Sequence, residues 1–441
     1  MKNSVYALLI LLFVCMCRCK QTPASLPQLT SNDISHVITR MTDLMIHDVT
    51  NPPLAARFFS YACLSGYEIV SQNNSASKTM HGVLNGYPLI KKPDSISSYS
   101  YPLSAILAMM ETAKKMQPSG KLLAAYEDNF LDSCKRTGYP DEVISSSKKY
   151  ALVISKQILA YAKADGYTTI SNLPRYTPLD KDSSWYPTPP AYMAAVEPYF
   201  QKIRAFTLDS STQFRPIPPV PFSTDKKSAF YKMLLLNYNE NASSPELHRV
   251  IAGFWDCNPF AVQDNGHMMV GLKKISPGAH WLGIAGIACL KAKKSFDEAM
   301  QINTLVAIGL MDSFIACWQE KYGSNRIRPE TAIRKYVDVN WNPLLQTPPF
   351  PEYLSGHSCI SATSAVILTR YFGDHFNYTD SVEVSYGLQP RSFESFQQAS
   401  IEAGISRFYG GIHFMDGINN GRTQGLEVGE WVLQKMNAGK K

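Results

Sequence analysis

The sequence predicts an all-α protein, and two observations support that prediction. Apolar residues recur at helical spacing through most of the 441 residues, whereas alternating strand patterns are scarce. Apolar residues make up 45% of the chain and charged residues 18%, which is typical of a globular protein that buries a core. We therefore expect helical bundles joined by long proline-rich loops.

The predicted helices are distributed along the whole chain. They cover residues 54–70, 103–116, 143–164, 191–206, 247–254, 279–292, 296–318, 360–372, 393–404 and 425–436. Proline-rich connections at 171–192 and 215–225 separate some of them. We expect an N-terminal helical region over 20–240 and a second helical bundle over 241–441, which contains the more specific motifs.

The first 19 residues, MKNSVYALLILLFVCMCRC, predict a bacterial signal peptide. A lysine precedes an apolar run at 5–16, which has the length of a signal-peptide core and is too short to span a bilayer. Cys15, Cys17 and Cys19 follow, and Cys19 is the first candidate for a lipoprotein anchor. We expect an exported protein that is periplasmic, secreted, or attached to the outer membrane only through an N-terminal lipid.

Composition also narrows the class of partner. The formal charge of +7 is modest, and the chain has no dense run of lysine and arginine, so nucleic acid is not an expected partner. A few cations gathered at one site suit an anionic small molecule better. The six later cysteines are scattered without a CxxC pair, so their spacing predicts no zinc site and assigns no disulfide.

Three short stretches contain residues suited to binding an anion. In ACWQEKYGSNRIRPETAIR (316–334), Lys321 and Arg328 lie seven residues apart, so a continuous helix would present both on one face. Ser355-Gly356-His357 lies where proline-rich chain turns into a predicted helix. Exposed amides and the helix dipole attract anions at such a terminus.

The third stretch is GISRFYGGIHFMDGINNG (404–421), which contains Arg407 and His413. Asp416 follows His413 by three residues, and a carboxylate one helical turn away can orient an imidazole. Taken singly, the three stretches are explained by a solvated helix face, a helix cap and a salt-bridged helix start.

Together, the three stretches match an ordered signature. Lys-x6-Arg-Pro, Ser-Gly-His and Ser-Arg-x5-His resemble the motifs of the type 2 phosphatidic acid phosphatase and vanadium-dependent haloperoxidase superfamily. IAGFWDCNPF, PGAHWLGIAG and PPFPEYLSGH are similar to the haloperoxidase branch, so the resemblance covers about 247–436. It implies the helical-bundle fold of that superfamily.

The resemblance also implies roles for the motif residues. Lys321, Arg328 and Arg407 would supply positive charge to bound vanadate or phosphate, and Ser355 and the Gly356 amide would supply neutral donors.

The two histidines would flank the same oxyanion. His413 would coordinate vanadium or attack phosphorus, and His357 would act opposite it as the acid/base group.

The resemblance further places Trp318 and Phe350 beside the vanadate, although core packing explains both aromatic residues equally well. The acidic residue of the superfamily usually follows the second histidine by four positions, whereas Asp416 follows His413 by three. Asp256 is a weaker candidate for neutralising Arg407.

The sequence is compatible with three functions. The first is a haloperoxidase that uses vanadate, hydrogen peroxide and a halide, with iodide or bromide favoured over chloride. The second is an exported phosphatase that hydrolyses phosphomonoesters through a phosphohistidine and needs no cofactor. The third is a non-catalytic, anion-binding surface lipoprotein.

The long body favours the haloperoxidase, because phosphatases of this superfamily are usually shorter or contain several membrane helices. Cys359, two residues after His357, would favour mild iodide chemistry or phosphatase activity if it faced the pocket. The sequence does not predict the oligomeric state.

Overall fold

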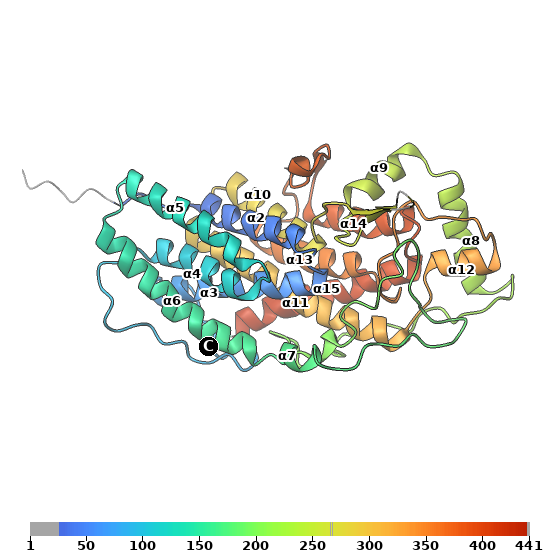
Figure 1. Cartoon of the computed structure of the whole chain (residues 1–441), viewed down its shortest axis with the longest axis horizontal. Coiled ribbons are helices and arrows are strands. Elements are labelled where there is room, and N and C mark those ends of the chain that lie inside the picture. Colours follow the sequence, from blue (N-terminus) through green and yellow to red (C-terminus); the bar gives the residue numbers. More distant parts are fainter. Residues whose placement is uncertain (1–25, 265, 267, 439–441) are drawn as a thin grey trace, which may run out of the picture.

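The computed structural model describes residues 26–264, 266 and 268–438, which form an elongated helical assembly (Figure 1). The helices α5 and α6 lie at one end of it, and α8 and α12 lie at the other. The predicted signal peptide and its three cysteines fall outside the described residues.

The helices of the N-terminal half are joined by extended chain and short 3-10 turns. In order they are α2 (Ser31–His47), α3 (Pro52–Asn73), α4 (Tyr101–Met116), η1 (Gly120–Leu122), α5 (Leu123–Thr137), α6 (Asp141–Lys163), α7 (Tyr167–Ile170), η2 (Phe200–Lys202) and α8 (Ala229–Ala242).

The C-terminal half adds two short antiparallel hairpins to the helices. Its elements are α9 (Glu246–Phe254), β1 (Val262–Asp264), β2 (Met269–Gly271), α10 (Pro277–Lys291), α11 (Phe296–Ser324), α12 (Pro329–Tyr336), α13 (Gly356–Phe372), β3 (Tyr378–Asp380), η3 (Val384–Tyr386), β4 (Arg391–Phe393), α14 (Phe396–Tyr409) and α15 (Met415–Ala438). In the hairpins, Val262 pairs with Gly271 and Tyr378 pairs with Phe393. The all-α prediction is confirmed.

One main hydrophobic core extends through the described residues, from Ile34 in α2 to Met436 in α15. It therefore contains side chains from both sides of the predicted boundary at 240–241. The long helix α11 packs against α3, α13 and α15. It is long and apolar enough to cross a membrane, but 94% of its most apolar window is buried, as in the core helix of a globular fold.

Glycines allow α15 to lie close to α13. Gly417, Gly421, Gly425 and Gly429 recur every fourth residue on α15. A Cβ on Gly421 would lie 3.0 Å from the carbonyl oxygen of Ser355, and one on Gly429 would lie 2.8 Å from Cβ of Val366. The low helix propensity of glycine explains why the sequence prediction, 425–436, missed the first ten residues of the helix. In the folded protein, close packing against α13 offsets that low propensity.

The helix predicted at 191–206 is wrong, because only η2 forms there. Pro198 lacks an amide hydrogen, and the amides of Phe206 and Thr207 donate to the buried Asp312 carboxylate at 2.6 and 2.7 Å. These contacts fix the segment as extended chain against α11. The helices α2, α5, α7, α8 and α12 were not predicted. The helix α14 begins at Phe396, where the Ser395 side chain accepts a hydrogen bond from the Gln398 amide at 3.1 Å.

A continuous helix from Lys321 to Arg328 is also wrong. The helix α11 ends at Ser324, and Asn325 follows with φ of 50°. Asparagine tolerates this left-handed conformation, and Pro329 then begins α12 with Arg328 as its N-cap residue. The two cations therefore lie on either side of the break between α11 and α12.

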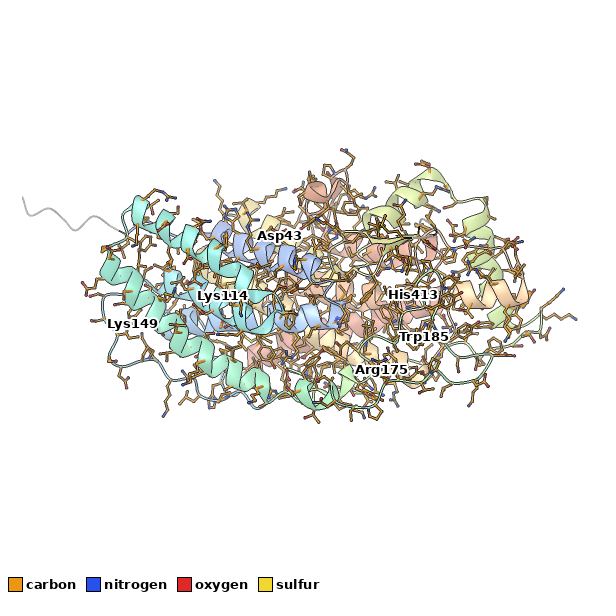
Figure 2. All side chains as sticks on the ribbon, in the orientation of Figure 1. Asp43, Lys114, Lys149, Arg175, Trp185 and His413 are labelled. Atoms are coloured by element: carbon orange, nitrogen blue, oxygen red, sulfur yellow. The ribbon has the colours of Figure 1, made fainter. Side chains whose placement is uncertain are left out.

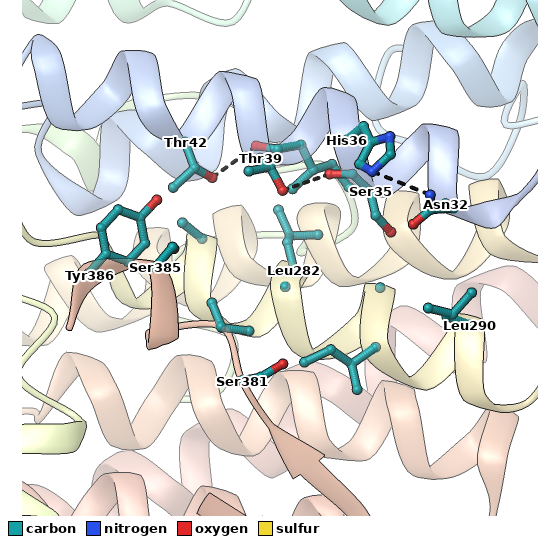
Figure 3. Close-up of a pocket in the computed structure, with 16 residues that line it drawn as sticks. Asn32, Ser35, His36, Thr39, Thr42, Leu282, Leu290, Ser381, Ser385 and Tyr386 are labelled. Atoms are coloured by element: carbon teal, nitrogen blue, oxygen red, sulfur yellow. Dashed lines mark hydrogen bonds between the residues drawn. The ribbon is translucent and has the colours of Figure 1, made fainter. Parts of the chain in front are cut away.

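A shallow cavity lies between α2 and α10, and Figure 3 shows the residues that line it. A Cβ on Gly286 would lie 2.6 Å from Oγ of Ser35, so the glycine permits the close approach of the two helices. None of the site residues predicted from the sequence lines this cavity.

Candidate active site

The candidate site is a small cavity in the half of the molecule that contains α8, α9 and α12, where Figure 2 labels His413. The cavity holds about 30 Å³, room for roughly two or three water molecules. Among the predicted residues, its lining includes Trp318, Phe350, Gly356, His357, Arg407 and His413. Lys321, Arg328 and Ser355 do not line the cavity, but Lys321 lies against the Phe350 ring, Arg328 contacts His413, and Ser355 directly precedes Gly356.

Lys321 is a fully buried cation near the end of α11. Its Nζ donates to the carbonyl oxygens of Pro351 and Glu352, both at 3.1 Å, and to that of Leu354. Nζ also lies 4.9 Å from the centre of the Phe350 ring. Burial lowers the pKa of Lys321 to about 8, so the ammonium is protonated below that pH.

Arg328 is buried against the same loop. Its Nε donates to the Phe350 carbonyl oxygen at 2.9 Å, and its Nη1 donates to the Ile412 carbonyl oxygen at 2.8 Å. Nη1 also lies 3.1 Å from Nε2 of His413. The remaining nitrogen, Nη2, is buried without a hydrogen-bond partner. An unpartnered guanidinium nitrogen in this position suits an anionic oxygen.

Arg407, near the end of α14, is the third buried cation. Its Nη2 donates to the carbonyl oxygens of Trp255 at 2.6 Å and Ala252 at 3.3 Å. The carboxylate of Asp256 lies 3.9 Å from Nη1, which agrees with its predicted partial neutralisation of Arg407. Asp256 also pairs with Lys274, so it does not belong to Arg407 alone.

Ser355 and Gly356 begin α13 as the sequence predicts. The Ser355 hydroxyl accepts a hydrogen bond from the Ser358 amide at 3.3 Å, which makes Ser355 the N-cap residue. A Cβ on Gly356 would lie 3.7 Å from the Trp318 ring, so a larger residue would narrow the cavity. The helix N-terminus thus faces the same space as the cations.

His413 is held by a carboxylate that the sequence did not identify. Its Nδ1 lies 2.8 Å from Oε1 of Glu352, and the same oxygen accepts the Phe414 amide at 3.0 Å. The contact makes Nδ1 the protonated nitrogen and leaves the lone pair on Nε2. Burial and the neighbouring cations, first Arg328, hold the pKa of His413 well below its usual value, so the ring is neutral.

Asp416 does not orient His413, and that prediction is wrong. Its carboxylate accepts two hydrogen bonds from Arg326 Nη1, at 2.8 and 2.9 Å, and one from the Val220 amide at 3.0 Å. The spacing argument failed because α15 begins at Met415, after His413, so the two residues do not share a helix. Glu352 lies 61 positions before His413, and no local pattern links the pair.

His357 lies in the first turn of α13 and lines the cavity. Its Nε2 is buried without a hydrogen-bond partner. Burial and the charge of Arg407 hold the pKa of His357 well below its usual value. A neutral imidazole with an unpartnered nitrogen can accept a proton from a group bound in the cavity.

Trp318 and Phe350 form the aromatic wall of the cavity, with ring centres 5.0 Å apart. Both rings also belong to the main core, so the packing and lining roles coexist. Cys359 is buried beside Gln424 and does not line the cavity. The cysteine that lines it is Cys257, and all six cysteines of the described chain are free thiols.

The arrangement suits a tetrahedral oxyanion such as vanadate. Three buried cations meet around one small cavity, and their hydrogen bonds go largely to backbone carbonyl oxygens, which do not cancel a full positive charge. Nη2 of Arg328 and Nε2 of His357 have no partner. The Nε2 lone pair of His413 accepts a hydrogen bond from Arg328 Nη1 at 3.1 Å, and it is the kind of donor that binds a metal centre.

Comparisons with known proteins agree with this chemistry. A family model described as "VCPO second helical-bundle domain" matches residues 301–439. The crystal structure of a bacterial vanadium-dependent iodoperoxidase matches with a TM-score of 0.87 and 41% identity, over 93% of this chain and 97% of that chain. The chain belongs to the vanadium-dependent haloperoxidase family. The predicted haloperoxidase branch is therefore confirmed.

More distant haloperoxidases share the fold. The holo form of a bacterial vanadium-dependent chloroperoxidase matches with a TM-score of 0.63 and 16% identity, over 95% of this chain and 94% of that chain. Its apo form matches with a TM-score of 0.64 and 15% identity, over 88% of this chain and 95% of that chain. No curated protein matches this haloperoxidase.

Proposed function

We propose that this haloperoxidase oxidises iodide or bromide, in preference to chloride, with hydrogen peroxide at a vanadate held by His413. One observation carries the proposal: Arg407 and a neutral His413 line one cavity, and the buried cations Lys321 and Arg328 contact its lining. The iodide preference is supported by the 41% identity to a protein described as an iodoperoxidase.

The proposed site residues have different roles, which follow from their chemistry. His413 would hold vanadate through Nε2, because Glu352 keeps the proton on Nδ1. Nη2 of Arg328, the Lys321 ammonium and the Arg407 guanidinium would balance the charge of the vanadate oxygens. When bound, vanadate supplies a Lewis-acidic centre that activates hydrogen peroxide toward a halide.

His357 would move protons on the opposite side of the cavity from His413. Its pKa lies well below the usual value, so the ring is neutral and can accept a proton from bound hydrogen peroxide at Nε2. The aromatic wall of Trp318 and Phe350 keeps bulk water away, which strengthens the electrostatic contacts inside the cavity.

The test is halide oxidation by the purified chain in the presence of hydrogen peroxide, with and without added vanadate. We expect iodide oxidation only with vanadate, a slower rate with bromide and the slowest with chloride. His413→Ala should reduce the vanadate-dependent rate by at least roughly 100-fold, as expected when a directly acting group is removed.

The same preparation should also be assayed with a phosphomonoester. Rapid hydrolysis without vanadate-dependent halide oxidation would overturn the haloperoxidase proposal in favour of the phosphatase. Binding of vanadate without either activity would favour the non-catalytic lipoprotein. Chloride oxidation as fast as iodide oxidation would contradict only the halide preference.

We also propose that residues 1–19 direct export and that Cys19 receives a lipid, since the apolar run and the cysteines follow a signal-like pattern. Labelling of cells with a fatty-acid analogue should mark the wild-type chain and not Cys19→Ser. Equal labelling of both would contradict the choice of Cys19, and a cytoplasmic location would contradict export.

A further inference from the structure

A second cluster of ligand-type side chains lies beside the cavity. Cys257 follows α9, His280 lies in α10, and Glu383 precedes η3. The ligand atoms of these three buried residues all lie within 4.8 Å of one another. The spacing of the cysteines predicted no zinc site. It gave no signal here because two of these three ligand-type residues are not cysteines.

The spacing of the three atoms suits a tetrahedral metal ion. Cys257 Sγ lies 3.4 Å from His280 Nδ1 and 3.5 Å from Glu383 Oε1, and Nδ1 lies 3.4 Å from Oε1. With zinc bonds of about 2.3 Å to sulfur and about 2.0–2.2 Å to nitrogen and oxygen, the edges of a tetrahedron are roughly 3.3–3.6 Å. The three observed edges match these values.

The imidazole is also oriented in the manner of a metal ligand. Nε2 of His280 lies 2.8 Å from Oδ2 of Asp380, while Oδ1 of Asp380 accepts the Val382 amide at 3.0 Å. A carboxylate that accepts the distal ring proton directs the other ring nitrogen toward a metal. The Trp255 ring stacks on His280 at 4.7 Å and fixes the plane of the imidazole.

We propose that Cys257, His280 and Glu383 bind one Zn²⁺, with a water molecule as the fourth ligand. The mixed set of thiolate, imidazole and carboxylate suits zinc better than the hard cations Ca²⁺ and Mg²⁺, which prefer oxygen ligands alone. Coordination replaces the proton of the Cys257 thiol, which leaves to solvent.

The zinc would fix one wall of the anion cavity. Cys257 lines that cavity, and the carbonyl oxygen of Trp255, two residues earlier, accepts a hydrogen bond from Arg407. Figure 3 shows the segment of Ser381 and Ser385 beside the helix that carries Leu282, so Glu383 and His280 come from neighbouring elements. A metal bond between them and Cys257 would hold the loop after α9 in place.

The experiment is zinc titration of the untagged full-length chain after metal removal, followed by elemental analysis and X-ray absorption at the zinc edge. We expect one zinc per chain with one sulfur ligand. Cobalt substitution should give thiolate-to-cobalt charge-transfer absorption. Cys257→Ser should abolish that absorption, and His280→Gln should reduce zinc affinity at least tenfold.

Three further variants sharpen the test. Asp380→Asn should weaken zinc binding by roughly 10–100-fold, because Asp380 orients a ligand without touching the metal. Cys289→Ser, which changes another buried cysteine outside the cluster, should bind zinc as the wild type does. His413→Ala should also retain zinc, which separates this site from the vanadate site.

Several outcomes would overturn the proposal. These are no zinc uptake by the wild-type chain, a wild-type zinc environment without sulfur, loss of zinc in His413→Ala, or equal affinity in Cys257→Ser and Cys289→Ser. If the cluster variants do not fold, the absorption spectrum of the wild-type chain still decides whether sulfur binds the metal.

Discussion

Two lysines in different halves of the molecule, the partly buried Lys114 and the fully buried Lys321, are held in different ways. Lys114 in α4 donates to carboxylate oxygens of Glu111 at 2.8 Å and Glu127 at 2.6 Å. Lys321 in α11 donates only to backbone carbonyl oxygens. Burial lowers both pKa values, but for Lys114 the two carboxylates outweigh burial and raise the pKa. For Lys321 the pKa falls to about 8.

The difference separates a charge that carboxylates neutralise within the fold from one that no carboxylate of the described chain hydrogen-bonds. Lys114 in α4 and Arg57 in α3 are both neutralised by carboxylates within the fold, and Arg57 pairs with Asp165 at 2.7 Å. Around the cavity, Lys321 and Arg328 donate mainly to backbone carbonyl oxygens, whose dipoles compensate a full charge only in part, and Arg407 shares Asp256 with Lys274. The fold thus maintains a positive site that an oxyanion can neutralise.

The largest expected effect on stability comes from removing Arg57, a cation that a carboxylate neutralises. Arg57→Met should destabilise the protein by about 3–5 kcal/mol, because Asp165 would remain as an unpaired buried charge. Lys321→Met should lower the free energy of unfolding by less, because it removes an ammonium whose burial is unfavourable. It should nevertheless abolish the stabilisation that bound phosphate gives to the wild type. Denaturant midpoints with and without phosphate measure both effects, and equal destabilisation by the two variants would contradict the comparison.

The next effect concerns the partner of His413. Glu352→Gln should lower vanadate-dependent turnover by roughly 10–100-fold, as expected when a group that orients a metal ligand is changed. Asp416→Asn is the matched control and should have a smaller effect, because Asp416 contacts Arg326 and not His413. A larger loss of turnover in Asp416→Asn would return the orienting role to that residue.

The pH dependence of anion binding should report on Lys321. Its pKa is about 8, so the ammonium is charged below pH 8 and loses its proton above it. Phosphate affinity should therefore fall as pH rises through 8, by at most about tenfold per pH unit. Calorimetric titration measures this fall. In Lys321→Arg the fall should move to higher pH, because a guanidinium keeps its proton longer, and an unchanged profile would remove Lys321 from the site.

The smallest expected effect is that of Cys359→Ser. The thiol is buried beside Gln424 and does not line the cavity, so the ratio of iodide to bromide turnover should not change. The ratio can be measured under saturating peroxide. A change of more than about twofold would show that the thiol influences the site despite its position, since such a change exceeds roughly 0.4 kcal/mol.

Most helices could be predicted because their apolar spacing reflects burial on one face. Two of the failures occur where contacts distant in sequence decide the backbone. Asp312 binds the amides of Phe206 and Thr207 and prevents a helix there, and the glycines of α15 form a helix only because α13 lies against them. Local propensity does not include either contact.

The sequence by itself determined the helical class and the order of the three motifs, and it predicted seven site residues: Lys321, Arg328, Ser355, Gly356, His357, Arg407 and His413. The tertiary structure decided which groups surround them. Glu352 contacts His413, which lies 61 positions later in the chain. Cys257, His280 and Glu383 come together from three separate segments. The physical reason is that a motif records which donors and cations the chemistry needs. Charge balance and hydrogen-bond partners depend on packing between segments far apart in the chain.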